Sequence, residues 1–247
     1  MNGWRPDAGP GLDAAIEELR TGTLDVVGRL PWSSNLTFLV TVGTGWAEDG
    51  EPLGAVYKPA TGEQSLWDFS DGLYRREVAA YELSEALGWG LVPPTVERDD
   101  APYGPGSLQL FVAADYEQHY FTLFDEGGRD GVLRTMCAFD VVANNADRKS
   151  GHVLRGPDGR LWAIDHGLCF HRQPKLRTVI WDYADEEVPS GLLTDLGRLA
   201  SHLPEEVARL LSAPEREALV DRIDALVRSG RFPEPLGDRP PYPWPLV

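Results

Sequence analysis

The chain has 247 residues, of which 42% are hydrophobic, so it is long and apolar enough to form one large domain or two small lobes. Its 39 acidic and 23 basic residues give a formal net charge of −16, and a field of this sign repels nucleic acid and anionic lipid. We therefore expect a folded, soluble protein with no nucleic-acid partner and no membrane partner.

Two further features of the composition indicate a cytoplasmic protein. No apolar run approaches the ~20 residues that span a membrane, and the N-terminal MNGWRPDAGP contains no hydrophobic signal region. The two cysteines, Cys137 and Cys169, are too few for a disulfide framework or a zinc cage. They could pair with each other, but we expect two free, buried thiols.

The chain begins with a helix and a hairpin. An amphipathic pattern in residues 12–29 predicts a short helix that breaks at Gly22 and an apolar run able to start a strand. Apolar and β-branched residues then predict a hairpin whose strands lie in 33–43 and 53–59. Lys58 comes at the end of its second strand.

A helix and two more strands follow. The stretch at 71–87 has helical periodicity and closes at Gly88, and Glu77 is the charged residue of its inward face. The sequences LVPPTVE at 91–97 and GSLQLFVAA at 106–114 predict two strands separated by a polar turn.

The pattern changes beyond Asp115, where a second lobe is expected to begin. Residues 130–146 predict a buried helix, and residues 194–230 predict two or three amphipathic helices punctuated by prolines. The proline-rich tail FPEPLGDRPPYPWPLV predicts an extended segment that wraps the surface.

Between these helical stretches, VLR, the turn GPDG and RLWAI predict a compact hairpin, because proline and glycine sit where a turn favours them. If Leu154 faces Leu161, then His152 lies opposite Ala163 and Asp165 is two residues further along. Side chains two apart in a strand point to the same face, roughly 7 Å from the facing neighbour. His152 and Asp165 are therefore predicted to lie close together.

Asp147 lies on the loop before this hairpin and can reach the same end from another direction. Two carboxylates and an imidazole this close would repel or titrate unusually without a cation, so one divalent metal could bridge them. Each residue also has a plainer interpretation: Asp147 as a turn or cap residue, and His152 as an ordinary core or surface histidine. His166, beside Asp165, is interpreted as structural.

The sequence DRKSGH and, thirteen residues after its histidine, the aspartate of IDHG resemble two motifs of phosphatidylinositol 3- and 4-kinases and related atypical kinases, D-R-H-x-x-N and I-D-F-G. The resemblance implies that Asp147 is the catalytic-loop aspartate and that Asp165 is the principal magnesium ligand. It places Lys149 at the family's histidine and His152 at its metal-binding asparagine. With that histidine replaced, Asp147 is the only evident general base.

Weaker similarities keep the same order along residues 30–185. GAVYKP resembles the strand of the phosphate-binding lysine, and RREVAAYELSEALG the helix of its carboxylate partner. SSNLTF resembles the phosphate-covering loop, although it contains no glycine and is no P-loop, and GSLQLFV resembles the strand entering the adenine hinge. The nucleotide-binding residues implied in this way are Lys58, Glu77 (with Glu82 if the helix is rotated), Ser33, Ser34, Asn35, Phe111, Val112 and Ala113.

The same lysine has a physical rationale of its own. Phosphoryl transfer needs mainly positioning and positive charge around the triphosphate, which Lys58 can supply. Glu77 can anchor its ammonium group. The alternative is a surface lysine and an exposed glutamate.

The resemblance implies an α+β, bilobed protein-kinase-like fold, with an N-terminal antiparallel-sheet lobe and a mainly helical C-terminal lobe. We expect residues 1–114 to form the phosphate-binding lobe and residues 115–247 the lobe with the catalytic and metal-binding loops. It identifies the chain as a small, stand-alone bacterial member of that superfamily.

The expected function is ATP-dependent phosphoryl transfer with Mg²⁺, and a histidine ligand allows Mn²⁺ to replace it. The basic cluster Arg172, Lys175 and Arg177 is modest, so a protein or small-molecule acceptor is expected rather than a lipid. Three alternatives stay open: a nucleotide-binding pseudokinase-like regulator, an AMP transferase, and a metal-dependent hydrolase that uses no nucleotide.

Overall fold

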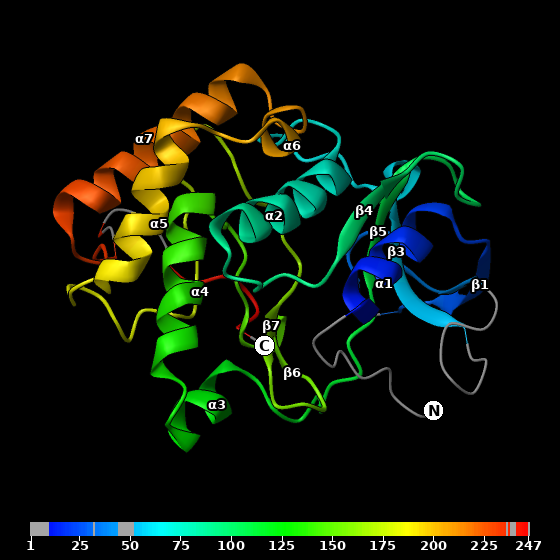
Figure 1. Ribbon diagram of the computed structural model, residues 1–247, viewed down its shortest axis with the longest axis horizontal. Coiled ribbons are helices and arrows are strands. Elements are labelled where there is room, and N and C mark those ends of the chain that lie inside the picture. Colours follow the sequence, from blue (N-terminus) through cyan, green and yellow to red (C-terminus); the bar gives the residue numbers. More distant parts are fainter. Residues whose placement is uncertain (1–9, 32, 44–51, 236, 238–240, 247) are drawn as a thin grey trace.

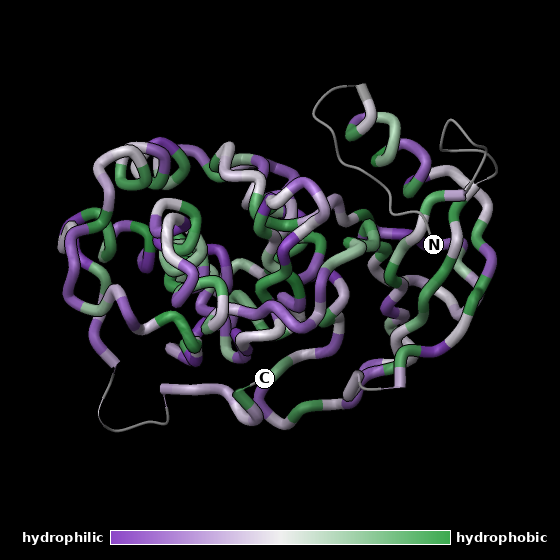
Figure 2. Tube along the Cα trace, turned by 90° about the horizontal axis from the view of Figure 1, so that it is seen from below, coloured by the Kyte–Doolittle hydropathy of each residue, from purple (hydrophilic) through white to green (hydrophobic). Residues whose placement is uncertain are grey.

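The computed structural model describes residues 10–31, 33–43, 52–235, 237 and 241–246. An N-terminal antiparallel sheet of five strands is followed by a mainly helical region (Figure 1). The predicted α+β class with this order of parts is confirmed. Figure 2 shows the same two parts from below, with the strands on the right and the helical part on the left.

The sheet has the strand order β1-β2-β3-β5-β4, and every neighbouring pair is antiparallel. Its strands are β1 (Leu24–Arg29), β2 (Phe38–Val42), β3 (Leu53–Pro59), β4 (Thr95–Arg98) and β5 (Gly106–Leu110). Helix α1 (Pro10–Thr21) precedes them and packs on the sheet through Ala15 and Leu19. The predicted opening helix, the strand after Gly22 and the hairpin are all present.

The first strand of the predicted hairpin is shorter than expected, and most of its turn cannot be compared. The stretch expected to be a strand at 33–43 is a strand only from Phe38, because Ser33–Asn35 form a polar loop between β1 and β2. Most of the expected turn at 44–52 lies outside the described residues.

Alternation along β3 determines where its lysine points. Leu53, Ala55 and Tyr57 are buried in the apolar cluster beneath the sheet. Successive residues of a strand point to opposite faces. Lys58 therefore points to the other face, which helix α2 (Leu73–Leu87) covers.

Helix α2 lies between the sheet and the helical region (Figure 1) and ends at Gly88, whose φ of 71° gives the left-handed cap that glycine favours. Most of its side chains are buried, and they form one apolar core with helices further along the chain. Glu77 is 3% exposed in this helix, as the predicted inward face requires.

The helical region contains α3 (Tyr120–Glu126), α4 (Asp130–Ala143), α5 (Ser190–Ser201), α6 (Glu205–Ala208) and α7 (Ala213–Ser229), with short 3-10 turns at Ala60–Gly62 and Ser150–His152 elsewhere in the chain. The buried helix and the proline-punctuated helices were predicted. Helix α3 was not, and α5 begins four residues before the expected start at 194.

The state of the two cysteines and the lengths of the helices can also be compared with the predictions. Cys137 and Cys169 are free and buried, as expected. Within the described chain, every helix is too short or too polar to cross a bilayer.

The hairpin of β6 (Val153–Arg155) and β7 (Leu161–Ala163) is present, but its register differs by one residue from the expected one. Leu154 pairs with Trp162, not with Leu161, so His152 is not opposite Ala163. The turn causes the shift. Gly156 N donates to Arg160 O at 2.8 Å, so three residues lie between this pair, one more than in a two-residue turn. The additional residue is Gly159, whose φ is 81°.

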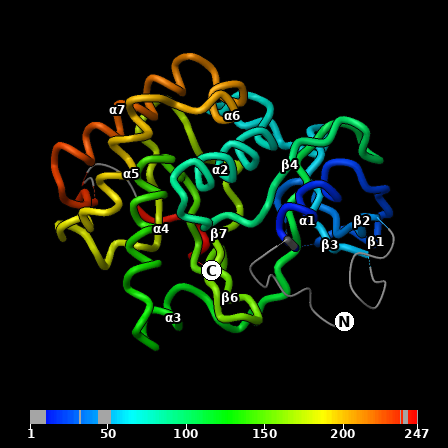
Figure 3. Tube along the Cα trace, viewed as in Figure 1, coloured from blue at the N-terminus to red at the C-terminus, as the bar shows by residue number. Residues whose placement is uncertain are grey.

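The C-terminal segment, red in Figure 3, contacts the turn before β6 and the segment at 178–181. Thr178 N and the Trp181 indole donate to Pro241 O at 3.1 and 3.0 Å, and Ser150 N donates to Leu246 O at 2.8 Å. The described part of the tail is extended and lies on the surface of the helical region, as its composition predicted.

A buried arginine joins α2 to the helical region. The Arg76 guanidinium pairs with Glu215 of α7 and donates to Cys169 O at 3.0 Å. Burial alone would raise the pKa of Glu215, but hydrogen bonds from Ser212 and the charge of Arg76 outweigh it, so its pKa lies below the ordinary 4.5.

We expect Glu215→Gln to lower the free energy of unfolding by about 1–3 kcal/mol at pH 7. Because the folded pKa is depressed, the charged form contributes stability above pH 4.5, and this contribution is lost as the pH falls through the folded value. Denaturant unfolding from pH 7 to pH 3 should therefore show the two proteins converging. Glu217→Gln, on the exposed face of α7, is the control, and a pH-independent difference would contradict the assignment.

Candidate active site

Three side chains from distant parts of the chain, Lys58, Glu77 and Asp165, lie in contact. Its ammonium group forms ion pairs with Glu77 of α2 and with Asp165, whose Oδ1 lies 2.9 Å away. Glu77 uses its other oxygen, Oε2, to accept the backbone N–H of His166 at 2.9 Å. Of the predicted nucleotide-site residues, the structure thus brings Lys58, Glu77 and Asp165 together.

The charges of Lys58 and Asp165 stabilise each other, whereas burial raises the pKa of Glu77 in spite of Lys58. Burial alone would lower the pKa of Lys58, but the carboxylates of Asp165 and Glu77 outweigh it and raise that pKa above its usual range. Burial raises the pKa of Asp165, but Lys58 and His152 more than reverse this and hold it well below its usual range. Lysine and aspartate are therefore both charged at neutral pH.

Asp165 is displayed by an unusual backbone. Its φ of 62° lies in the left-handed region, which costs free energy for a non-glycine residue and directs the side chain out of the strand line. Its Oδ2 lies 3.3 Å from His152 Nε2, and its side chain is 45% exposed. The predicted proximity of His152 and Asp165 is therefore observed in spite of the shifted register.

Burial lowers the pKa of His152 to about 4, so the ring is neutral at pH 7. Its Nδ1 accepts a long hydrogen bond from Lys149 N at 3.4 Å, which corresponds to a proton on Nε2, facing Asp165. Metal binding through Nε2 requires the other tautomer, with the proton on Nδ1. His152 as a metal ligand stays a prediction.

The donors present fit a magnesium ion that is shared with a nucleotide. The described residues contain no group of three or more His, Cys, Asp or Glu side chains able to hold a metal by themselves. Mg²⁺ in nucleotide sites commonly takes one or two protein carboxylates and completes its shell with phosphate oxygens and water. Asp165 is half-exposed and offers such a carboxylate.

Asp147 lies in a different pair. Its carboxylate binds the ammonium of Lys149, and its backbone N–H donates to Asn145 Oδ1 at 3.0 Å. Burial raises its pKa above the usual value, although Lys149 opposes this shift. A carboxylate of raised pKa accepts a proton more readily, which suits a general base.

The polar loop at Ser33–Asn35 lies beside the end of β3. Phe38 pairs with Tyr57 in the sheet, so the residues before Phe38 lie next to those after Tyr57. Asn35 Oδ1 accepts Gln64 N at 2.9 Å, Ser34 O accepts Gln64 Nε2 at 2.6 Å, and the Ser33 hydroxyl lies 2.7 Å from that of Thr37. Both hydroxyl and amide groups of the loop are thus near the strand that carries Lys58.

The connection at 111–114 leaves the sheet after β5 and packs on the hairpin of β6 and β7. Val112 is buried against Leu154 and Trp162, and Phe111 N donates to Gly54 O at 3.0 Å. Among the described residues, nothing hydrogen-bonds to the backbone N–H or C=O of Ala113. Those groups are available to an adenine edge, which is the positional role predicted for this segment.

A buried arginine that the sequence analysis missed holds the loops together. Arg148 is fully buried, and its guanidinium binds the Asp140 carboxylate at 3.0–3.1 Å. It also donates to His152 O at 3.3 Å, to Ile164 O at 2.8 Å and to His166 Nε2 at 2.7 Å. One side chain therefore fixes the backbone on both sides of the His152–Asp165 contact. The sequence did contain one indication of this network: Asp140 is a carboxylate inside a mostly apolar helix, and a buried carboxylate requires a positively charged partner.

His166 has the structural position expected for it. It is fully buried, and accepting from Arg148 requires a neutral ring. Burial, together with the charge of Arg148, lowers its pKa well below the usual range.

No family model matches the sequence. Protein Rv2133c of Mycobacterium tuberculosis is 39% identical over 265 residues, and the match covers 92% of this chain and 93% of that protein. This chain belongs to the Rv2133c family.

Two solved structures resemble this member of the Rv2133c family in fold. Golgi casein kinase, solved with Mn and ADP bound, matches with a TM-score of 0.55 and 15% identity, covering 96% of this chain and 80% of that one. The hydra Fam20 protein, solved with sugar, gives a TM-score of 0.58 and 13% identity, covering 91% and 89%. At these identities the likeness establishes the fold alone, which is protein-kinase-like.

We expect Arg148→Lys to destabilise the Rv2133c-family protein by about 3 kcal/mol, because an ammonium cannot reproduce the forked contacts to Asp140 and leaves that buried carboxylate underpaired. Urea unfolding measures this loss. Arg172→Lys is the matched control, since Arg172 is exposed. Equal losses in the two variants would refute the structural role of Arg148.

We expect Lys58→Met to be less stable by about 3 kcal/mol, because the Glu77 carboxylate is then buried without its counter-ion. Lys58→Met/Glu77→Gln should recover much of that loss, since glutamine keeps an acceptor for His166 N and removes the charge. Thermal unfolding of both variants and the parent tests this. A single variant as stable as the parent, or a double variant less stable than the single one, would show that the pair is not coupled.

Proposed function

We propose that this protein is an ATP-dependent phosphotransferase of the atypical-kinase type. The observation that carries the proposal is the cluster in which Lys58 of β3 binds both Glu77 of α2 and Asp165 after β7. Such a cluster positions an ammonium and a metal-binding carboxylate side by side, which is what a triphosphate requires. The kinase-like fold supports the proposal, and the motif similarity to phosphatidylinositol 3- and 4-kinases gives the finer assignment.

The residues take the following roles. Lys58 binds phosphate oxygens and Glu77 anchors it, while Asp165 and His152 hold the divalent ion. That ion, when bound, supplies positive charge to the phosphates. We propose Mg²⁺ with Mn²⁺ as a substitute, and the neighbouring fold of Golgi casein kinase was solved with Mn and ADP.

The nucleotide is proposed to lie between the sheet and the helical region. The loop at Ser33–Asn35 covers its phosphates, and the connection at Phe111–Ala113 meets its adenine. The division of the chain into lobes at residue 114 is part of this proposal, since the last sheet strand ends at Leu110 and α3 begins at Tyr120.

Transfer itself requires an acceptor oriented by Asp147. The acceptor oxygen attacks the γ-phosphorus, the bond from that phosphorus to ADP breaks, and the acceptor proton passes to Asp147. Lys149 stays beside Asp147 and can balance its charge. The proposed acceptor is a protein or a small molecule.

The same Asp147–Lys149 ion pair favours a second candidate function. Although the pKa of Asp147 is raised overall, the Lys149 ammonium opposes that rise and occupies one oxygen of the carboxylate. A protein of this kind could bind nucleotide and act as a regulator without transferring phosphate. Transfer of AMP in place of phosphate would be recognised by the mass of the product.

We expect Asp165→Asn to lose most metal-dependent nucleotide binding, because it removes charge from the ground-state complex. Asp147→Asn should bind nucleotide nearly as the parent does but should not transfer, because its contribution arises in the transition state. Calorimetry with ATP and Mg²⁺ or Mn²⁺, alongside single-turnover transfer followed by mass spectrometry, measures both.

Asp158→Asn, on the turn between β6 and β7, is the control for loss of one surface charge. If Asp165→Asn binds metal and nucleotide as tightly as the parent, the metal assignment is wrong. If the parent binds nucleotide but transfers nothing, the protein is a nucleotide-binding regulator and not a phosphotransferase.

A further inference from the structure

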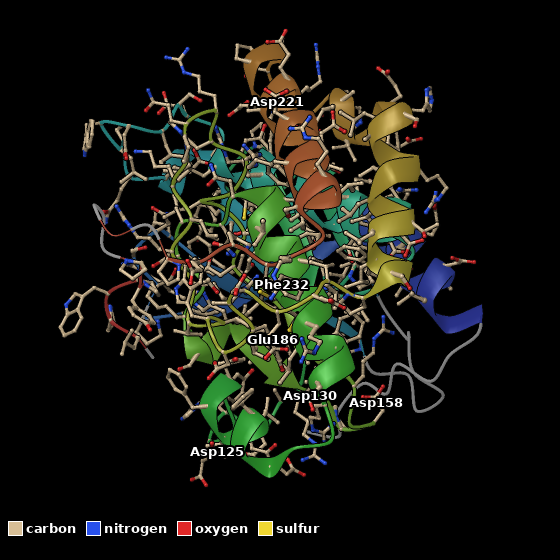
Figure 4. All side chains as sticks on the ribbon, turned by 90° about the vertical axis from the view of Figure 1, so that its left-hand side faces the viewer. Asp125, Asp130, Asp158, Glu186, Asp221 and Phe232 are labelled. Atoms are coloured by element: carbon tan, nitrogen blue, oxygen red, sulfur yellow. The ribbon has the colours of Figure 1, made fainter. Side chains whose placement is uncertain are left out.

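The last described residues of the chain, 241–246, contact the loop that carries Asp147, and we refer to these residues as the strap. The strap follows α7, and Figure 4 shows Phe232 just past the end of that helix. Pro243 is the buried residue of the strap, whereas Trp244 is 88% exposed. Backbone hydrogen bonds, more than buried side chains, therefore hold the strap in place.

One end of the strap binds the loop just after Asp147. Ser150, which is fully buried, donates its backbone N–H to Leu246 O at 2.8 Å. On the other side of the same peptide group, Lys149 O accepts His152 N at 3.1 Å. The planar peptide group between Lys149 and Ser150 is thus held from both sides, and the strap is one of its two partners. This limits the direction of the Lys149 side chain, which pairs with Asp147.

The other end of the strap supports the same loop through a second segment. Arg148 uses its backbone N–H and C=O to pair with the segment at 177–179, at 3.0 and 3.1 Å. In that segment Thr178 N donates to Pro241 O at 3.1 Å, and the Trp181 indole donates to the same oxygen at 3.0 Å. The strap therefore contacts the backbone that supports the proposed general base on both of its sides.

The proposed nucleotide-binding cluster is held by different contacts. Lys58 binds both Glu77 and Asp165. The backbone before Asp165 is fixed by Arg148, whose guanidinium donates to Ile164 O at 2.8 Å. Loss of the strap should therefore disturb the acceptor side of the proposed site and leave nucleotide binding intact.

Proline at every second position prepares the strap for this task. Pro241, Pro243 and Pro245 each have a restricted φ, so the segment loses less conformational entropy on ordering than an ordinary chain does. A segment that is extended beforehand can hold a loop with few hydrogen bonds.

We infer that the strap is a positioning element for the transfer step: it fixes the loop at 147–152 so that Asp147 and Lys149 keep the orientation that transfer requires. The inference rests on the proposed function, in which Asp147 takes the proton of the attacking oxygen. A displacement of about 1 Å in a catalytic group can lower a rate about a hundredfold. Two hydrogen-bonded contacts at the edges of this loop are therefore enough to matter for transfer.

The hold of the strap on the loop is tested by amide hydrogen exchange, followed by NMR. Removal of residues 246 and 247 takes away the carbonyl that accepts Ser150 N, whereas Leu246→Ala keeps that carbonyl. We expect exchange at Ser150 to be about tenfold faster in the shortened protein and to return to the parental rate in Leu246→Ala. The Ala163 amide, which donates to Leu91 O at 2.8 Å, should exchange equally in all three proteins. Equal exchange at Ser150 in the parent and the shortened protein would overturn the inference.

The positioning role is tested with water as the acceptor and γ-labelled ATP with Mg²⁺ as the donor. In this reaction the water oxygen bonds to the γ-phosphorus, the bond from that phosphorus to ADP breaks, and a water proton passes to Asp147. We expect single-turnover release of labelled phosphate to be about tenfold slower in the shortened protein and to recover in Leu246→Ala. Calorimetry should find the same ATP affinity for all three proteins, which a general loss of folding would not give.

Three results would overturn the positioning role: equal rates of phosphate release in the parent and the shortened protein, a loss of ATP affinity as large as the loss of rate, or ATP binding by the parent without any release. Absence of metal-dependent ATP binding by the parent would instead overturn the proposed function. In that case the exchange rates at Ser150 would still decide whether the strap holds the loop.

Discussion

The ion pairs of Lys58 connect the two parts of the molecule, and the rest of the candidate site depends on them. One ammonium from the sheet meets Glu77 from α2 and Asp165 from the loop after β7. The Glu77 carboxylate, which is 3% exposed, would not be stable as a charge without Lys58, because a lone charge in a protein interior is strongly disfavoured. Together they set the distance between sheet and helical region, so the site exists only when both are folded against each other.

Buried arginines likewise connect separate segments within the helical region. Arg148 joins three segments through two backbone carbonyls, the Asp140 carboxylate and the His166 imidazole, and Arg76 joins α2 to α7. The planar guanidinium can serve several acceptors at once, which a lysine cannot do. The acidic composition of the chain therefore does not describe its interior, where paired positive charges hold the loops of the candidate site.

The sequence allowed the sheet, α2 and its inward Glu77 to be predicted, because hydrophobic periodicity and the Gly88 cap are local signals. The motif around Asp147 and Asp165 located the loops. The register of β6 and β7 was missed by one residue, since an extra residue in the turn with φ of 81° at Gly159 is not visible in composition. The Arg148 network was missed for another reason: it depends on contacts between segments far apart in the chain, and periodicity carries no information on such contacts.

The placement of α2 has a consequence for motion. Its apolar side chains belong to the core of the helical region, and Arg76 ties it there. Tyr74 and Arg75 at its start also bind Glu97 of β4, so α2 is held on both sides. A rigid-body rotation that opened the sheet away from the helical region would, whichever side α2 followed, draw Lys58 away from Asp165. Opening therefore costs electrostatic free energy, and salt, which screens exposed charges more than buried ones, should lower that cost because Asp165 is half-exposed.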